Sequence, residues 1–370
     1  MKIICSKLNL LQGVNIVSKA VPTRTTMPIL GCILIDASSN EIKLTANDTE
    51  LGIETIIDGQ IEERGIIALD AKVFSELVKK LPDNDVLLQT DTANQVTIQC
   101  EKSKFTIAAK AGEDFVHLPY VERNNYIELS QFVLKEVIRQ TIFSVADNDN
   151  NKIMTGELFE LNENQLTVAS LDGHRISIRR IQLDESYPAR KMIVPGKTLQ
   201  EVSKILPGGA EDTVKLFFTE NHIIFEFDST TVVSRLIEGE YFKIEHMLSA
   251  AYETKIKVKK RELFDCIDRA TLLVKEGDKK PIIMDIDNER LELKINSYIG
   301  SMDEEVFITK EGKDITIGFN ARLFLEALRV IDDEEISIYM INPKAPCFIK
   351  DEDETYTYLI LPVNFNSAAE

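Results

Sequence analysis

The stretch LDAKVFSELVKKLPDN at residues 69–84 occurs in related form at two later places in the chain. The related copies are VPGKTLQEVSKILPGG at 194–209 and FNARLFLEALRVIDDE at 319–334. One basic residue stands at the same place in each copy, at intervals of 125 residues: Lys72, Lys197 and Arg322. An even repeat of this length predicts one structural module used three times. Repeated modules build symmetric surfaces, so the pattern favours a function that depends on the shape of such a surface.

The length of the chain agrees with three modules. A pitch of 125 residues in a chain of 370 gives three domains of ordinary size. We place these domains at residues 1–122, 123–248 and 249–370. Hydrophobic residues make up 44% of the chain and charged residues 28%, as in most soluble globular proteins.

The sequence indicates a reducing compartment and no metal site. The five cysteines are scattered and never form C-x-x-C: Cys5, Cys32, Cys100, Cys266 and Cys347. None of the four histidines lies at metal-ligand spacing from another. No apolar run approaches the ~18 residues of a membrane span, and Lys7, Asn9 and Gln12 interrupt any signal-like start. We therefore expect a cytoplasmic protein without a metal or other cofactor.

Each third begins with a pattern typical of an amphipathic helix, at residues 7–20, 130–146 and 259–275. The repeated stretch supplies a second helix. Short alternating runs between them predict strands, for example at 41–46, 51–58, 157–161, 165–169 and 175–182. A module is then two helices packed on antiparallel strands, which is an α+β fold. Three modules give six helices, which we expect to form one layer.

Charge is distributed unevenly between these helices and the rest of the chain. The net charge is −18, which taken alone argues against a nucleic-acid partner. The six predicted helices and their flanking residues nevertheless carry 17 basic and eight acidic residues, counted over 7–24, 70–80, 130–146, 196–206, 259–275 and 319–330. The remainder carries 26 basic and 53 acidic residues. Helices often carry Lys and Arg for solubility alone. Because the basic residues fall at equivalent places in the repeat, a second interpretation is that they form a positive surface that attracts a polyanion.

Six short strings on this repeat resemble the family of bacterial DNA sliding clamps, the beta subunit of DNA polymerase III. They are TMPIL at 26–30, LTANDTE at 44–50, LDGHR at 171–175, VPGK at 194–197, GFNAR at 318–322 and YLILPV at 358–363. The resemblance covers the whole chain. It implies that three clamp modules form half of a closed ring, which a head-to-tail homodimer completes. It further implies a non-enzymatic processivity factor that encircles double-stranded DNA without reading its sequence.

The resemblance implies that basic residues on the helices face the DNA. Sliding requires contacts to phosphates rather than to bases. Arg24 and Lys197 match DNA-facing positions of the family most directly, and Asn320 is a further candidate. The full set of candidates is Arg24, Lys72, Lys79, Lys80, Lys135, Arg139, Lys197, Lys204, Arg269, Lys275, Asn320, Arg322 and Arg329.

The resemblance also implies a hydrophobic pocket that binds short linear motifs of partner proteins. These partners are the polymerase III alpha subunit, the clamp loader, other polymerases and repair proteins. Methionines beside aliphatic residues suit a pocket that serves many partners. Carried over residue by residue, the pocket comprises Met154, Thr155, Leu171, Gly173, His174, Arg175, Ile176, Phe242, Met247, Leu359, Ile360, Leu361, Pro362 and Val363. The family often has proline at the position of Phe242, so the preferred peptide is left open.

Other classes of function remain to be separated from the clamp. A hydrolase or nucleotidyl enzyme would use His174 and Asp172, but the sequence supplies no nucleophile or metal-ligand set beside them. Gly196-Lys197-Thr198 matches the end of a P-loop. The position of the first glycine that a P-loop requires is, however, occupied by Lys191. A three-module scaffold that does not bind DNA is the third possibility. For the subunit contacts we suggest Phe105 and Ile107 at one end and Leu272 and Leu273 at the other.

Overall fold

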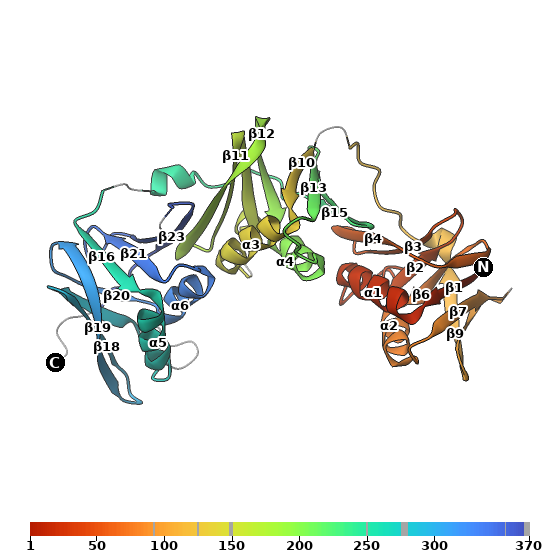
Figure 1. Cartoon of the computed structure of the whole chain (residues 1–370), viewed down its shortest axis with the longest axis horizontal. Coiled ribbons are helices and arrows are strands. Elements are labelled where there is room, and N and C mark those ends of the chain that lie inside the picture. Colours follow the sequence, from red (N-terminus) through yellow and green to blue (C-terminus); the bar gives the residue numbers. More distant parts are fainter. Residues whose placement is uncertain are drawn as a thin grey trace. The chain divides into compact units, whose positions relative to one another are not determined.

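The computed structural model describes residues 1–91, 93–123, 126–147, 151–248, 251–274, 280–351 and 353–365. The chain divides into two compact units, and Figure 1 labels helices and strands of both. The first unit comprises Met1–Lys135 and Lys197–Leu236, and the second comprises Glu136–Gly196 and Ile237–Glu370. Each unit is built on one large antiparallel sheet, so the middle third of the chain contributes to both.

The sheet of the first unit has thirteen strands in the order β10-β13-β14-β15-β4-β3-β2-β6-β9-β8-β7-β1-β5. Their bounds are β1 Lys2–Ser6, β2 Cys32–Asp36, β3 Ile42–Asn47, β4 Leu51–Ile57, β5 Gln60–Glu63, β6 Ile66–Asp70, β7 Asp85–Thr90, β8 Gln95–Cys100, β9 Ser103–Ala111, β10 Tyr126–Ser130, β13 Thr213–Phe218, β14 His222–Phe227 and β15 Thr230–Arg235. Strand β15 of the middle third pairs with β4 of the first third, with Thr230 opposite Thr55.

The sheet of the second unit has ten strands in the order β11-β12-β23-β22-β21-β16-β19-β18-β17-β20. Their bounds are β11 Gly156–Leu171, β12 Arg175–Pro195, β16 Thr254–Lys259, β17 Ile282–Asp287, β18 Arg290–Asn296, β19 Ser301–Gly312, β20 Ile315–Phe319, β21 Glu335–Met340, β22 Cys347–Lys350 and β23 Tyr356–Ile360. Strand β12 of the middle third pairs with β23 of the last third, with Arg175 opposite Ile360. Both sheets therefore continue from one third of the chain into the next.

The strands predicted at 157–161 and 165–169 are one strand, β11, so that prediction was wrong in detail. The register of β11 against β12 shifts between Leu161 and Gln165. Polar residues at 162–165 look like a turn in the sequence, but an irregularity of this kind lets a strand continue through them.

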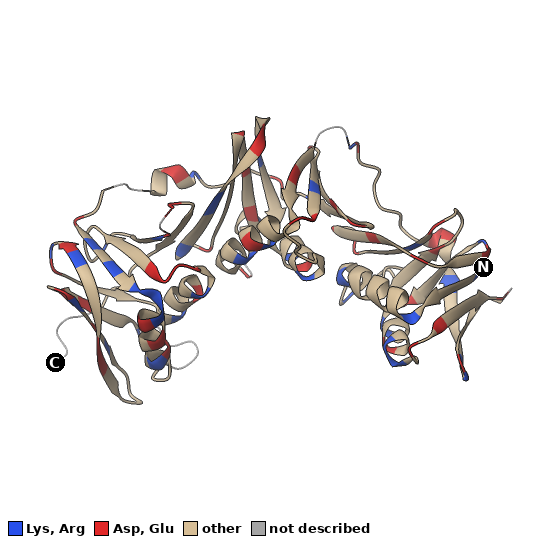
Figure 2. Cartoon of the chain, in the orientation of Figure 1, with Lys and Arg blue, Asp and Glu red and all other residues tan. Residues whose placement is uncertain are grey.

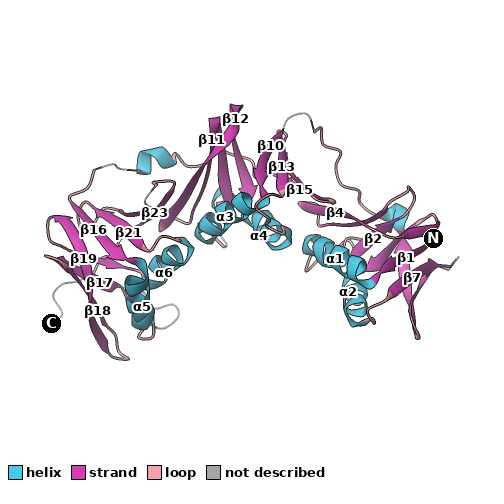
Figure 3. Cartoon of the chain, in the orientation of Figure 1, coloured by secondary structure: helices cyan, strands magenta, loops and turns pink. Residues whose placement is uncertain are grey.

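The described residues contain six α-helices: α1 Lys7–Val17, α2 Ala71–Lys80, α3 Gln131–Thr141, α4 Gly196–Ile205, α5 Lys260–Thr271 and α6 Ala321–Val330. Side-chain caps fix several of their starts. The Ser6 hydroxyl accepts the N–H of Asn9 at 3.2 Å, and the Asp70 carboxylate accepts that of Val73 at 2.9 Å. Helices α1 and α2 contact each other in the first unit, as do α5 and α6 in the second (Figure 3).

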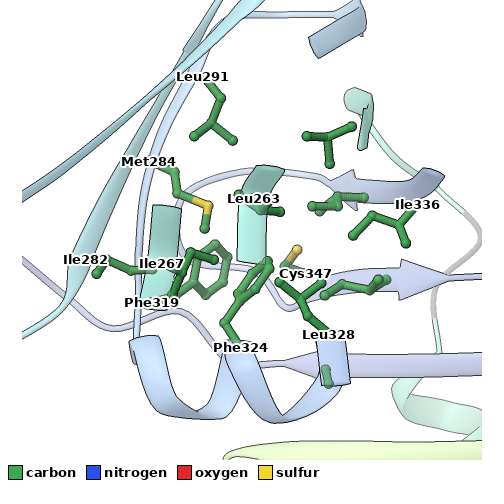
Figure 4. Close-up of a cluster of buried hydrophobic side chains, with 14 of the residues drawn as sticks. Leu263, Ile267, Ile282, Met284, Leu291, Phe319, Phe324, Leu328, Ile336 and Cys347 are labelled. Carbon is green, nitrogen blue, oxygen red and sulfur yellow. The ribbon is translucent and has the colours of Figure 1, made fainter. Parts of the chain in front are cut away.

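The repeated stretch recurs because it fills equivalent places in the core. Phe74, Leu199 and Phe324 lie two positions after the repeated basic residues, and each side chain is 0% exposed. In the last third, Phe324 packs with Phe319 at a ring-centroid distance of 5.3 Å, among aliphatic side chains of α5 and the sheet (Figure 4). Burial of one such side chain contributes roughly 1.5–3 kcal/mol.

The ends of the predicted helices differ from the structure. The helix predicted at 7–20 passes into a 3₁₀ turn at Ser18–Ala20, and that predicted at 130–146 does so at Ile142–Ser144. Helix α5 ends at Thr271, and Lys275 lies outside the described residues. In the described part of the chain, no helix is long and apolar enough to cross a membrane.

Candidate functional site

A cavity of about 470 Å³ lies in the second unit, where β12 pairs with β23. Ten of the residues predicted for the peptide pocket line it: Met154, Leu171, Gly173, His174, Arg175, Ile176, Phe242, Met247, Leu359 and Leu361. His246 and Pro346 also line it. Residues that are far apart in the sequence therefore meet around one hollow.

The turn between β11 and β12 holds one wall of the cavity in place. The Asp172 carboxylate accepts the N–H groups of His174 and Arg175 at 2.9 and 3.2 Å. Gly173 adopts φ +85°, a conformation that glycine takes without strain. The N–H of Leu361 donates to the His174 carbonyl at 2.9 Å, which fixes the tail against this turn.

The cavity combines a buried apolar floor with an exposed apolar rim. Leu171, Ile176 and Leu359 are buried and form part of one hydrophobic cluster. At the rim, Met247 and Leu361 are 42% and 40% exposed. A concave apolar site with a few polar groups is the usual form of a ligand pocket. Exposed apolar side chains at its rim lose contact with water when a ligand covers them.

Four of the predicted pocket residues do not line the cavity. The tail was predicted as a continuous run from 359 to 363, but side chains of a strand alternate between its faces. Leu359 and Leu361 therefore face the cavity, whereas Ile360 is 0% exposed and belongs to the core. The N–H of Val363 donates to the Gly318 carbonyl at 2.8 Å, and Pro362 precedes it. The Thr155 hydroxyl donates to the Lys152 carbonyl at 2.7 Å.

The sequence did not single out His246 or Pro346. His246 lies beside the predicted Met247 in the 3₁₀ turn Ile244–Met247, so this neighbour was a usable signal. Pro346 directly precedes β22, and only the pairing of β22 with β23 brings it to the cavity. No local pattern marks such a residue.

Arg175 connects the cavity to its surroundings. Its Nε donates to Asp172 Oδ2 at 2.8 Å, and its other nitrogens donate to Glu326 of α6 and to the Phe143 carbonyl. Burial disfavours the charge of Arg175, but Tyr358, Glu326 and Asp172 together keep the pKa of the guanidinium above its ordinary value. Arg175 therefore joins the turn before β12 to a helix of the last third.

The DNA-facing candidates are spread over both units. In the first unit, Arg24, Lys72, Lys79, Lys80, Lys197 and Lys204 are exposed and Lys135 is half-buried. In the second unit, Arg269, Asn320, Arg322 and Arg329 are exposed and Arg139 is half-buried. Basic and acidic residues alternate along helices such as α5 (Figure 2). The remaining candidate, Lys275, is outside the described residues.

Several of these cations already have acidic partners. Lys79 pairs with Glu76 at 3.0 Å and Lys204 with Glu201 at 2.8 Å, each within one helical turn. Longer-range pairs join Lys197 to Asp48 at 2.6 Å and Arg269 to Glu304. Pairs between exposed side chains contribute only about 0–1 kcal/mol, whereas the Asp48 side chain is only 8% exposed and its pair with Lys197 is better shielded.

Other candidates make different contacts. Arg139 pairs with Glu136 at 2.5 Å and with Asp332 at 2.6 Å. Lys135 donates to the Leu206 carbonyl at 3.0 Å, and the Arg329 guanidinium lies 5.8 Å from the centre of the Phe264 ring. The Asn320 side chain accepts the N–H of Arg322 at 3.0 Å and caps α6. Asn320 and Lys135 therefore have structural roles that the sequence did not indicate.

Comparisons with known proteins agree along the whole chain. Models of the N-terminal, central and C-terminal domains of the DNA polymerase III beta subunit match residues 1–119, 128–243 and 246–364. Proteins named beta sliding clamp from Staphylococcus epidermidis and Staphylococcus aureus are 34% and 35% identical over 356 residues. These alignments cover 93% of this chain and 94% of each relative.

Solved structures give the same result. A crystal structure from Eubacterium rectale, assigned to the DNA polymerase III beta subunits, is 70% identical with a TM-score of 0.97. The DNA polymerase sliding clamp of Bacillus subtilis is 32% identical with a TM-score of 0.95. Each alignment covers 99% of this chain and 100% of the other. The chain belongs to the family of the bacterial DNA polymerase III beta subunit, the beta sliding clamps.

Proposed function

We propose that this protein is a DNA sliding clamp: two chains close head to tail into a ring that encircles double-stranded DNA and tethers the replicative polymerase. The observation that carries the proposal is the match along the full length to clamps of known structure. The family acts as a non-catalytic processivity factor, so the reading of His174 and Asp172 as a hydrolase site is set aside. The expected setting is the cytoplasm, in association with the nucleoid.

The ring has six modules, three from each chain, with the boundaries 1–122, 123–248 and 249–370. The repeated helices and the three matched domain models support this division. The two compact units do not follow the thirds, because each sheet continues across a boundary through β4 and β15 or through β12 and β23. In a closed ring the same continuation at the subunit contact would pair strand edges that are free in the single chain.

The first and last thirds of the chain supply surfaces for such a contact. In the described part of the chain, residues 103–107 of β9 pair only with β8, and residues 301–306 of β19 pair only with β18. Phe105 on β9 is 43% exposed, whereas Phe307 and Leu272 of the last third are 82% and 77% exposed. Large exposed apolar side chains beside unpaired strand edges are typical of an interaction surface.

Basic side chains of the six helices would hold the DNA through its phosphates. Contacts to phosphates carry no sequence information, so the ring has no preferred register and slides. The rest of the chain, with 53 acidic and 26 basic residues outside the predicted helical segments, would repel DNA. The set comprises the described candidates together with Lys275; the pairs they form with Glu76, Glu201 and Glu304 would open as phosphates approach.

The cavity beside Arg175 would bind short linear motifs from polymerase III alpha, the clamp loader, other polymerases and repair proteins. Its apolar floor and exposed methionine and leucine rim support this assignment. Thr155, Ile360, Pro362 and Val363 would support the walls rather than touch the peptide, because they lie outside the lining.

Sedimentation tests the ring directly. We expect the purified chain to sediment with twice its mass of 41.9 kDa at micromolar concentration, because both free sheet edges are then paired. Dilution should convert the dimer into monomers, and no species larger than the dimer should occur at any concentration. A chain that is monomeric at every concentration, or that forms open-ended polymers, would contradict a closed head-to-tail dimer.

A further inference from the structure

Three turns with the same pattern of hydrogen bonds recur in the chain at equivalent places of the repeat, although of their second residues only Thr49 and Gly173, and not Tyr298, have positive φ. They are Asp48–Leu51, Asp172–Arg175 and Ser297–Gly300, at spacings of 124 and 125 residues. In each turn the N–H of the first residue donates to the carbonyl of the fourth, at 3.0, 3.4 and 2.9 Å. The first side chain accepts the N–H of the third residue in all three, at 3.0, 2.9 and 3.1 Å.

In the first turn the second carboxylate oxygen reaches the next third of the chain. Asp48 Oδ1 serves the turn, while Asp48 Oδ2 accepts the Lys197 ammonium at 2.6 Å. Lys197 lies at the start of α4, the second helix of the middle third. The Asp48 side chain is only 8% exposed, so this link is better shielded from water than most surface pairs.

The second turn makes a similar link through Arg175. Asp172 Oδ2 accepts Arg175 Nε at 2.8 Å, and Arg175 donates to Glu326 on α6, the second helix of the last third. Glu326 follows Arg322 by four positions, as Glu201 follows Lys197 and Glu76 follows Lys72. Each of these first two turns is therefore tied by charge to the second helix of the following third, beside the strand pairs β4 to β15 and β12 to β23.

The third turn has no charged group to make such a link. The Ser297 hydroxyl accepts the N–H of Ile299 at 3.1 Å and lies 3.2 Å from the Gly300 carbonyl. Serine has one side-chain oxygen, whereas aspartate has a second oxygen left over for a cation. Helix α2 nevertheless carries Lys72, exposed, at the repeat position of Lys197.

We propose that Ser297 leaves the contact between two subunits without the ionic link that both contacts within the chain possess, and that this missing link weakens the dimer. This inference rests on the proposed head-to-tail ring. In that ring the module that follows the third turn belongs to a second copy of the chain, and its second helix is α2. An aspartate at position 297 would then reach the partner's Lys72. The occupant of the turn's outer face is thus a second copy of this chain.

The test compares dimer dissociation, measured without DNA by sedimentation of dilution series at low and high salt. Ser297→Asp should tighten the dimer. A gain of about fivefold for one partly shielded pair becomes roughly 25-fold in the dimer Kd, because a closed dimer contains two such contacts. High salt should remove most of the gain.

Three variants identify the cause. Ser297→Asn keeps the turn acceptor without a charge and should leave the Kd unchanged. Lys72→Gln in the Ser297→Asp background should abolish the gain, whereas Lys72→Gln alone should leave the wild-type Kd unchanged. A Ser297→Asp dimer no tighter than the wild type, or a Lys72→Gln single variant that weakens it, would overturn the inference. A wild-type chain that never dimerises would overturn the proposed ring itself, which is a distinct result.

Discussion

Replacement of Leu361 by aspartate is expected to lower the affinity of the cavity for a polymerase-derived peptide at least about 100-fold, which corresponds to about 3 kcal/mol. Leu361 lines the cavity at its rim, together with apolar side chains that include Met154 and Phe242. A carboxylate there must lose its hydration when the peptide covers it, and Arg175, the guanidinium that lines the cavity, is already bonded to Asp172 and Glu326. A few central apolar contacts commonly carry most of the binding energy of such a site.

Fluorescence anisotropy with a labelled peptide measures this effect. Tyr120→Asp is the matched control, because Tyr120 is 93% exposed, lies outside the cavity and undergoes a comparable loss of apolar surface. The control should bind peptide as the wild type does, and both variants should remain dimers. Undiminished binding by the Leu361→Asp variant would show that the peptide binds elsewhere.

Replacement of Glu157 by glutamine is expected to stabilise the second unit strongly at pH 8 and only weakly at pH 4. Glu157 lies on β11 and is 0% exposed. The Thr141 hydroxyl donates to its Oε2 at 2.9 Å, while Oε1 has no hydrogen-bond partner among the described residues. Burial raises the pKa of this carboxyl to about 8, although the bond from Thr141 opposes the rise.

The direction of the pH dependence follows from this raised pKa. The folded state favours the protonated acid, so the contribution of Glu157 to stability is fully present below its unfolded pKa, near 4.5. That contribution is lost as the pH rises through about 8. Glutamine does not titrate. The difference in unfolding free energy between the Glu157→Gln variant and the wild type therefore grows to at most about 5 kcal/mol across this pH window.

Thermal unfolding followed at a series of pH values checks the prediction. The melting temperature of the Glu157→Gln variant should exceed that of the wild type increasingly from pH 5 to pH 8. Glu160→Gln is the control, since Glu160 lies on the same strand but pairs with Lys191 at 2.8 Å near the surface. Parallel pH profiles for wild type and Glu157→Gln would mean that Glu157 titrates normally.

The sequence predicted the repeated parts of the fold well, because the core itself repeats. Phe74, Leu199 and Phe324 occupy equivalent buried places, so the helices that carry them were recognisable from spacing alone. The first strand of each third was missed: β1, β10 and β16. These strands are short and directly precede a helix, and their positions depend on pairing with distant strands such as β7, β13 and β21.

The candidate sites show where local reasoning stops. Ten pocket residues could be carried over from the family resemblance, but the inward or outward direction of residues 359–363 required the strand β23. Likewise, the sequence assigned Lys197 to DNA, and only the tertiary structure reveals its contact with Asp48. The partner of a charged side chain 149 positions away cannot be read from spacing.

The most direct test of the ring is its retention on DNA of different topology. The labelled protein is loaded by a bacterial clamp loader onto a nicked circular duplex, freed of unbound protein by gel filtration at high salt, and followed before and after a single-site nuclease linearises the DNA. We predict lasting retention on the circle, because encirclement does not depend on screened charges, and rapid loss from the linear duplex, whose ends let the ring slide off. Equal retention on the circular and the linear DNA would contradict the account.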